Sequence, residues 1–232
     1  MATTATDMRR DRQSLLALLH LSSPGLPIGA FAYSQGLEYA LDCGWCSNAT
    51  EVQSWIECNL KTGLGQLDMP IYRRMYHAWQ NRSESELQHW NQTLLAFRES
   101  RELYDEDVQV GSAFAQWHLG QDRGRQAELS LCPTPTVVSM HALASILGYI
   151  PIEQALLGFT WSWCENQVAS ASKAMPMGQT DGQRILQAML PVIEAAVQGS
   201  AALRDDQIGS GLVGMAIASS LHECQYSRLF RS

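Results

Sequence analysis

Apolar residues recur along this chain at the spacing of amphipathic helices, and the pattern extends over most of its length. No stretch shows the alternation of β-branched and polar residues that is typical of a half-buried strand. The periodicity therefore predicts an all-α protein. The predicted helices cover residues 15–21, 34–41, 98–118, 137–147, 180–197 and 208–221, with further helices beginning near residues 50, 68, 83 and 151.

Several predicted helix ends carry residues with known capping behaviour. Thr50 and Ser83 each begin a sequence with capping-box spacing. Pro70 is typical of the first turn of a helix, and Gly148 is typical of a helix end. Neither a fixed-period repeat nor a low-complexity linker divides the chain. We therefore predict a single globular domain of roughly nine or ten helices over residues 13–221.

Two segments between helices, residues 22–38 and 173–183, need shaped turns because they combine Pro and Gly with polar residues. Either segment could be purely architectural, with an ordinary capped helix start after it. The residues expected to shape these loops are Pro24, Gly29 and Gly36 in the first segment and Gly178, Asp181 and Gly182 in the second.

The C-terminal tail, residues 222–232, differs from an ordinary polar chain end. It carries Tyr226, Leu229 and Phe230, with Arg228 between them. Chain ends are usually polar because few contacts offset the entropy lost on ordering them. Aromatic and Arg side chains, in contrast, are enriched in interface hot spots. The tail is therefore either packed back on the body of the protein or a docking peptide for a partner.

Composition narrows the class of protein. Charged residues make up 17% of the chain and hydrophobic residues 46%, whereas soluble domains contain roughly 25% charged residues. The small charged fraction favours surfaces that are shared with other chains. The formal net charge of −7 argues against a protein that binds nucleic acid.

Targeting signals are not evident. The uncharged stretches are interrupted well before the ~18 apolar residues that a membrane span needs, so we expect no membrane segment. Residues 1–12 lack the apolar centre of a signal peptide. We predict that they form a flexible leader on a cytoplasmic protein.

The six cysteines are dispersed, and a disulfide framework is not expected in a chain of this size. Cys43 and Cys46 have C-x-x-C spacing, but no strand precedes them and no second pair accompanies them, as a redox or zinc motif would require. We attribute this spacing to chance or to packing.

Known catalytic motifs are incomplete in this sequence. Residues 178–184 lack the spacing and the Lys of a phosphate-binding loop, and residues 222–226 have Tyr where a zinc-protease motif needs its second His. A helix face with several carboxylates is expected to be solvated and paired with Arg. This face contains Glu102, Asp105, Glu106 and Asp107, with Arg98 and Arg101 beside them.

Two other classes of protein stay open at this point. One is a helical metal-dependent hydrolase that would use Glu102, Asp105 and Glu106 with a histidine such as His118. The other is a structural adaptor without catalytic activity.

Five segments resemble, in the same order, those of the UreF family of urease accessory proteins, and they span nearly the whole chain. The first and last are long enough to be specific, whereas the middle ones are short. The segments are residues 23–38, 68–70, 100–103, 177–183 and 225–232.

The resemblance implies an all-α, dimeric and non-enzymatic maturation factor for nickel urease. Together with the apolar composition, it suggests a homodimer formed around residues 151–163. Its implied partners are a scaffold accessory protein (UreD, also called UreH), the accessory GTPase UreG and apo-urease. The family is thought to position the GTPase and to couple its nucleotide state to nickel delivery. No tightly bound cofactor is implied, although nickel could bind transiently.

The resemblance also suggests roles for individual residues. Tyr226, Leu229 and Phe230 would be buried on the scaffold protein, with Arg228 forming hydrogen bonds at the rim. Lys173 would direct a positive charge towards the GTPase, or would be an ordinary lysine at a helix C-terminus.

The remaining candidate residues lie at the two ends of the chain. Tyr33 and Ser34 are expected to hold the first loop and to belong to the partner-binding set. His222 and Cys224 carry donors that nickel accepts and would point to the same side of an extended tail, so two tails of a dimer could supply four ligands. The alternative is that both residues pack or have no role.

Overall fold

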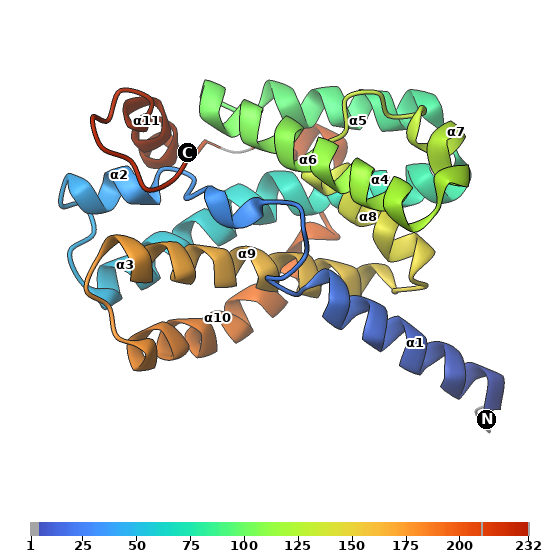
Figure 1. The fold of residues 1–232 in the computed structure, drawn as a ribbon, viewed down its shortest axis with the longest axis horizontal. Coiled ribbons are helices and arrows are strands. Elements are labelled where there is room, and N and C mark those ends of the chain that lie inside the picture. The colour runs from blue at the N-terminus through green and yellow to red at the C-terminus, as the bar shows by residue number, and fades with distance from the viewer. Residues whose placement is uncertain (1–4, 210, 232) are drawn as a thin grey trace.

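The computed structural model of the protein describes residues 5–209 and 211–231. All regular secondary structure in these residues is helical, and the helices pack into one domain (Figure 1), which confirms the predicted fold class. The elements are α1 (Ala5–Leu21), η1 (Ala30–Ala32), α2 (Leu37–Asp42), α3 (Ala49–Cys58), η2 (Asn59–Asp68), α4 (Met69–Asn81), α5 (Glu84–Ala96), α6 (Arg101–Gln121), η3 (Arg123–Arg125), α7 (Gln126–Leu129), α8 (Val137–Leu147), α9 (Ile152–Ala174), α10 (Gln179–Ser200), η4 (Asp205–Gln207) and α11 (Val213–His222).

The core lies where the long helices meet. α9 packs against α10, α2 and α1, while α4 packs against α8, α5 and η2. Large side chains such as Tyr72, Phe114, Met140 and Leu143 are buried between α4, α6 and α8. Burial of each such side chain contributes roughly 1.5–3 kcal/mol. The helical periodicity of the sequence therefore reflects one continuous core.

A continuous helical rod runs from α3 through η2 into α4. η2 is a π-helix, and Asp68, at its end, has helical φ and ψ angles of −65° and −46°. α4 begins at Met69 with Pro70 in its first turn, as predicted, but it continues from η2 without a break because the chain is already helical at Asp68. The Asp68 side chain binds Arg98 instead of capping a helix.

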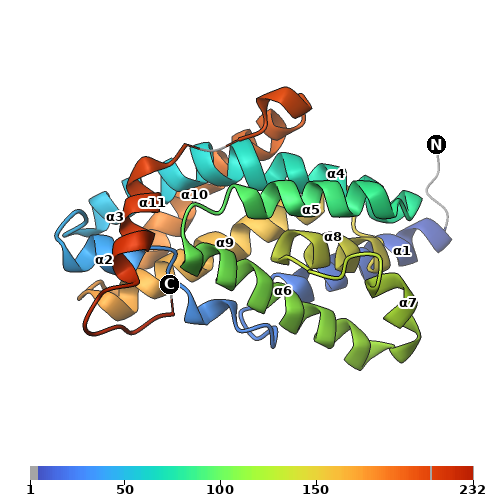
Figure 2. The same ribbon diagram turned by 90° about the horizontal axis from the view of Figure 1, so that it is seen from above.

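The N-terminal helix α1 begins at Ala5, within the predicted leader of residues 1–12, and continues through the predicted helix at 15–21. Residues 1–4 lie outside the described residues. Figures 1 and 2 show α1 at one end of the molecule, and it packs against α9 and α8.

Several predicted boundaries shift by a few residues. Asn48, and not Thr50, caps α3, and its Oδ1 accepts from the backbone N–H groups of Thr50 and Glu51. Ser83 is the N-cap of α5 but forms no capping hydrogen bond with its side chain. α8 ends at Gly148 as predicted, whereas α11 begins at Val213, later than expected.

None of the helices in the described residues combines the length and apolar character needed to cross a membrane.

Candidate partner-binding site at the C-terminal segment

The C-terminal segment, residues 223–231, packs back onto the body of the protein beside α2 and the first turn of α6 (Figures 1 and 2). Its last described residue, Arg231, donates its backbone N–H to the carbonyl oxygen of Ala32 at 2.8 Å. The segment therefore connects the chain end to the loop that precedes α2. Ser232 lies outside the described residues.

The backbone before α2 determines where Glu38 lies. Gly36 is the N-cap of α2 and has φ 78°, in the left-handed region that favours glycine. A Cβ atom on Gly36 would lie 2.9 Å from the backbone nitrogen of Ser219 in α11. Glycine thus permits α2 and α11 to approach closely, and this approach places Glu38 beside His222.

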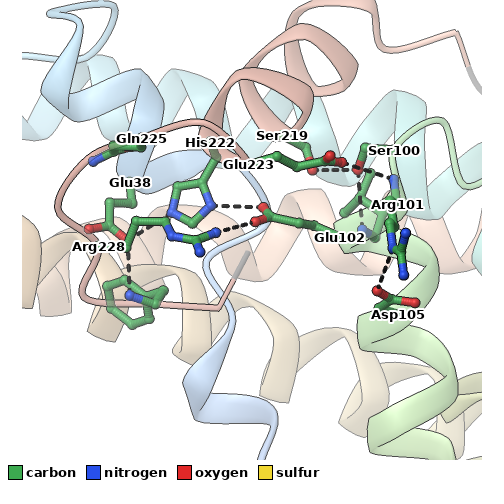
Figure 3. A network of polar contacts seen from close by, with 12 residues as sticks. Glu38, Ser100, Arg101, Glu102, Asp105, Ser219, His222, Glu223, Gln225 and Arg228 are labelled. Atoms are coloured by element: carbon green, nitrogen blue, oxygen red, sulfur yellow. Dashed lines mark hydrogen bonds and ion pairs between the residues drawn. The ribbon is translucent and has the colours of Figure 1, made fainter.

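His222, the last residue of α11, is fully buried between two carboxylates (Figure 3). Its Nδ1 lies 2.8 Å from Oε2 of Glu102, and its Nε2 lies 3.0 Å from Oε2 of Glu38. The histidine therefore joins the end of α11 to both α2 and α6.

Glu38 also holds the backbone of the C-terminal segment. Its Oε1 accepts the N–H of Leu229 at 2.7 Å, and its Oε2 accepts the N–H of Phe230 at 2.9 Å. Hydrogen bonds from N–H groups to an ionised carboxylate are stronger than those to neutral acceptors. One buried side chain thus fixes two successive peptide groups.

The first turn of α6 supplies the other half of the site (Figure 3). Oε1 of Glu102 accepts from Nη1 of Arg228 at 2.7 Å. The hydroxyl of Ser100 lies 2.6 Å from that of Ser219, and Glu223 accepts the backbone N–H of Arg101 at 3.1 Å. Burial raises the pKa of Glu102, while hydrogen bonding to His222 and the charges of His222 and Arg228 oppose the rise.

Phe230 is buried within this chain, although it was expected to become buried on a partner. Lys173, at the end of α9, lies over its ring with Nζ 5.6 Å from the centroid, and over the ring of Phe31 at 5.9 Å. Such cation–π contacts contribute roughly 0.5–1 kcal/mol at exposed sites. Lys173 is thus a neighbour of the C-terminal segment and keeps its solvent exposure.

Two other residues of the segment point to solvent. Tyr226 is fully exposed, with 105% relative accessibility, and Leu229 is 68% exposed. The structure therefore divides the predicted docking residues into two kinds. Phe230 and Arg228 attach the segment to the body, as the packed-back alternative describes, whereas Tyr226 and Leu229 are available to a partner.

Tyr33 and Ser34, predicted to bind a partner, are both buried and support the first loop. The Tyr33 hydroxyl donates to Gln109 at 2.9 Å, and the Tyr33 carbonyl accepts from Asn166. The Ser34 carbonyl accepts from Gln167. These contacts confirm the expected role in holding the loop, but buried side chains offer no surface to a partner.

The predicted loop residues have different local roles. Gly29 and Gly36 adopt positive φ values of 77° and 78°, and Pro24 lies in an exposed turn. Gly182 allows α9 and α10 to approach, since a Cβ there would lie 3.1 Å from Val168.

The second predicted loop ends where α10 begins. Gly178 is the N-cap of α10 and has ordinary extended angles. Asp181 pairs with Arg184 at 3.1 Å, in the first turn of the helix.

The pairing of His222 with Cys224 as metal ligands is not formed. The segment is not extended at this point: His222 ends a helix, both its ring nitrogens contact carboxylates, and Cys224 is exposed. Cys43 is exposed while Cys46 is buried. The described residues contain no group of three or more His, Cys, Asp or Glu side chains that could hold a metal ion.

The ligand set of the hydrolase alternative is also not assembled. His118 is buried, with Nε2 3.2 Å from the carbonyl oxygen of Met140, to which it donates as a neutral ring. Glu86 and His89 have the Glu-x-x-His spacing of helical di-metal sites. Within the described residues, no further ligands join them.

The carboxylate face of α6 was expected to be solvated, and this expectation is wrong for two of its members. Glu106 and Asp107 are buried. Arg98 bridges Asp107 and Asp68, at 2.7 Å from Asp107, inside the protein. The buried ion pairs of Arg98 with these two carboxylates therefore join η2 to α6.

Sequence reasoning did not single out Glu38 and Glu102 as the centre of the site. Both were part of segments noted for other reasons, the first loop and the carboxylate face. The available signal was the presence of an acidic residue in the first turn of a helix, which is too common to be specific.

The fold and the site define an all-α, single-domain protein that holds its own C-terminal segment on a cluster of two carboxylates and a buried histidine. Comparison with known proteins identifies its family. The model of the UreF family matches residues 46–190.

Relatives over the whole length agree with this match, and each is described as "Urease accessory protein UreF". The relative from Teredinibacter turnerae is 46% identical over 219 residues, which cover 94% of this chain and 98% of the relative. The relative from Marinobacter nauticus is 42% identical over 232 residues and covers 100% of both. The relative from Alkalilimnicola ehrlichii is 47% identical over 216 residues, or 93% of this chain and 94% of the relative. This chain belongs to the UreF family.

Proposed function

We propose that this protein is a non-catalytic urease maturation factor that bridges a scaffold accessory protein of the UreD/UreH type and a GTPase of the UreG type. In this role it couples the nucleotide state of the GTPase to delivery of nickel, as cargo, to apo-urease. Similarity over nearly the full length to relatives named urease accessory proteins supports the proposal. We expect the purified chain to hydrolyse neither GTP nor urea.

The observation that carries the proposal is the ordered C-terminal segment with two exposed apolar side chains, Tyr226 and Leu229. Glu38 already fixes the backbone of the segment at Leu229 and Phe230. A preordered segment loses less conformational entropy on binding than a disordered tail. The segment is therefore suited to recognise a scaffold protein through Tyr226 and Leu229.

Lys173 supports a second contact next to the first. It is exposed and lies over Phe230, so its position depends on the attached segment. We propose that this charge faces the GTPase, so that attachment of the segment affects both partners.

Affinity measurement with purified proteins tests the scaffold contact. Titration calorimetry of the scaffold accessory protein against Tyr226→Ala/Leu229→Ala should show a Kd raised at least about tenfold, or ~1.4 kcal/mol. Leu190→Ala on α10 is the matched control, because this leucine is 51% exposed and should leave the Kd unchanged.

The outcomes separate the parts of the proposal. Wild-type affinity of the double variant would exclude Tyr226 and Leu229 as recognition residues. A wild-type chain that forms no complex with either the scaffold protein or the GTPase would contradict the bridging function itself.

A further inference from the structure

The surroundings of His222 require one more proton than a neutral histidine carries. A neutral imidazole has one N–H donor and one bare nitrogen, and an ionised carboxylate only accepts. Here both ring nitrogens face carboxylate oxygens, at 2.8 Å and 3.0 Å. With a neutral ring and two ionised carboxylates, one of these pairs would bring two acceptors together. A doubly protonated ring donates to both.

The charges of the site agree with this count. Two ionised carboxylates, Glu38 and Glu102, are balanced by Arg228 and a protonated His222, whereas a neutral His222 beside them would leave one negative charge without compensation. The segment depends on this balance, since Glu38 also accepts two of its backbone N–H groups.

Other titratable groups around the site lie nearer to solvent. They come from α6, from the C-terminal segment and from α9, and they are Arg101, Asp105, Glu223, Cys224, Arg231 and Lys173. Arg101 pairs with Asp105, and the carboxylate of Glu223 accepts from the Arg101 backbone. Water screens these exposed charges, so the two carboxylates that contact the ring dominate the electric field there.

We propose that His222 is a positioning residue that attaches the C-terminal segment in its doubly protonated form and releases the segment when it loses one proton. The attached state then holds one proton more than a detached state whose ring is neutral. Attachment is complete at low pH and weakens as the pH rises. Linkage requires the equilibrium constant for attachment to decrease about tenfold per pH unit. This decrease applies in the range where the detached ring has lost its proton and the attached ring has kept it.

Replacement of Glu102 by Gln offers a direct test of the proton count. The side-chain amide of the Glu102→Gln variant can accept from Arg228 with its oxygen and donate from its nitrogen to Nδ1 of a neutral ring. Nε2–H of that ring still donates to Glu38. This variant should therefore keep the segment attached without the extra proton. Asp105→Asn is the matched control, because Asp105 lies on the same helix and pairs with Arg101 only through an exposed contact.

Hydrogen exchange on the isolated full-length chain measures attachment. The readout is the protection factor of the Leu229 and Phe230 amides from pH 5.5 to 8.5, corrected for intrinsic exchange, with core amides of α8 as the check on folding. Wild type and Asp105→Asn should lose about tenfold protection per pH unit on the alkaline side, and Glu102→Gln should show no such loss. His222→Gln, which cannot carry the charge, should lose protection at all pH values.

Nitrogen NMR of ¹⁵N-histidine-labelled protein locates the proton. We expect His222 to have imidazolium shifts wherever the segment is protected in wild type. Constant protection across the range in wild type would overturn the proposal, as would a neutral His222 ring in the attached state. Because both measurements use the isolated chain, they do not depend on any partner or on the proposed function.

Discussion

At the scale of single residues, Gly36 shows how closely α2 and α11 approach. An alanine at this position would be destabilised for two separate reasons. The backbone has a positive φ, and the added Cβ would lie 2.9 Å from the backbone nitrogen of Ser219. Gly29 has nearly the same φ, 77°, but no atom lies within 4 Å of its hypothetical Cβ. The two glycines therefore form a matched pair.

Substitution of these glycines should distinguish backbone strain from steric overlap. Gly29→Ala should lower the free energy of unfolding by about 1–2 kcal/mol through its left-handed backbone alone. Gly36→Ala should lower it by a further ~1–3 kcal/mol because α2 and α11 must move apart. Urea denaturation of both variants measures the difference. Equal losses would show that α11 moves freely at this contact.

Two buried histidines predict a loss of stability in acid. Burial lowers the pKa of His118 to about 4 and that of His141 to about 3. Below pH ~6.5 the unfolded chain takes up protons that these folded rings do not. Stability should therefore fall as the pH falls from ~6.5 towards the folded values.

Urea denaturation at pH 7.5 and pH 5 checks this acid effect. His118→Gln can keep a donor towards Met140 and should reduce the stability difference between the two pH values by roughly 2 kcal/mol. His77→Gln is the control, since His77 is exposed. An unchanged difference in His118→Gln would mean that folding does not shift the pKa of His118.

At the scale of elements, the C-terminal segment is attached to the core without being part of it. Its contacts include Glu38, Glu102, the carbonyl of Ala32, the backbone N–H of Arg101 and Lys173, whose ammonium lies over the Phe230 ring. Phe230 is buried but lies outside the main hydrophobic cluster. The helical core should therefore form without it.

Deletion of residues 225–232 should consequently leave the domain folded. We expect a change of only a few degrees in Tm, as for changes outside the core, together with loss of scaffold binding. Differential scanning calorimetry and the same binding titration on one truncated protein measure both properties. An unfolded truncation would place the segment in the core, and full complex formation would make the segment dispensable.

At the scale of the whole molecule, exposed leucines favour self-association. Leu15, Leu16 and Leu19 of α1 are all more than half exposed. α1 packs against α9, where Leu18 lies beside Gly158, so these leucines are close to the predicted dimer region at residues 151–163. Several exposed leucines on one helix are typical of a surface that another chain covers.

Light scattering tests the dimer. The wild-type chain should have twice its monomer mass at micromolar concentration, and Leu16→Asp/Leu19→Asp should be monomeric. Because both positions are exposed, the double variant should keep its helical circular dichroism spectrum. A monomeric wild type would contradict the prediction, unless the homodimer forms only in the presence of the partner proteins.

The sequence by itself determined the fold class and most of the helices. Apolar spacing depends on neighbours three and four positions away, so α8 and α9 could be placed from local residues alone. Local signals failed where a distant group competed for the same side chain. Asp68, for example, binds Arg98 and therefore caps no helix.

Only the tertiary structure decided the site. Glu38, Glu102 and His222 come from three helices, and their hydrogen bonds join residues separated by 120 and 184 positions in the chain. No periodicity or spacing records such pairs, because they depend on how α2, α6 and α11 pack. The sequence showed that the tail was unusual for a chain end. Packing against the carboxylates of Glu38 and Glu102 decided which of its residues attach it and which remain exposed.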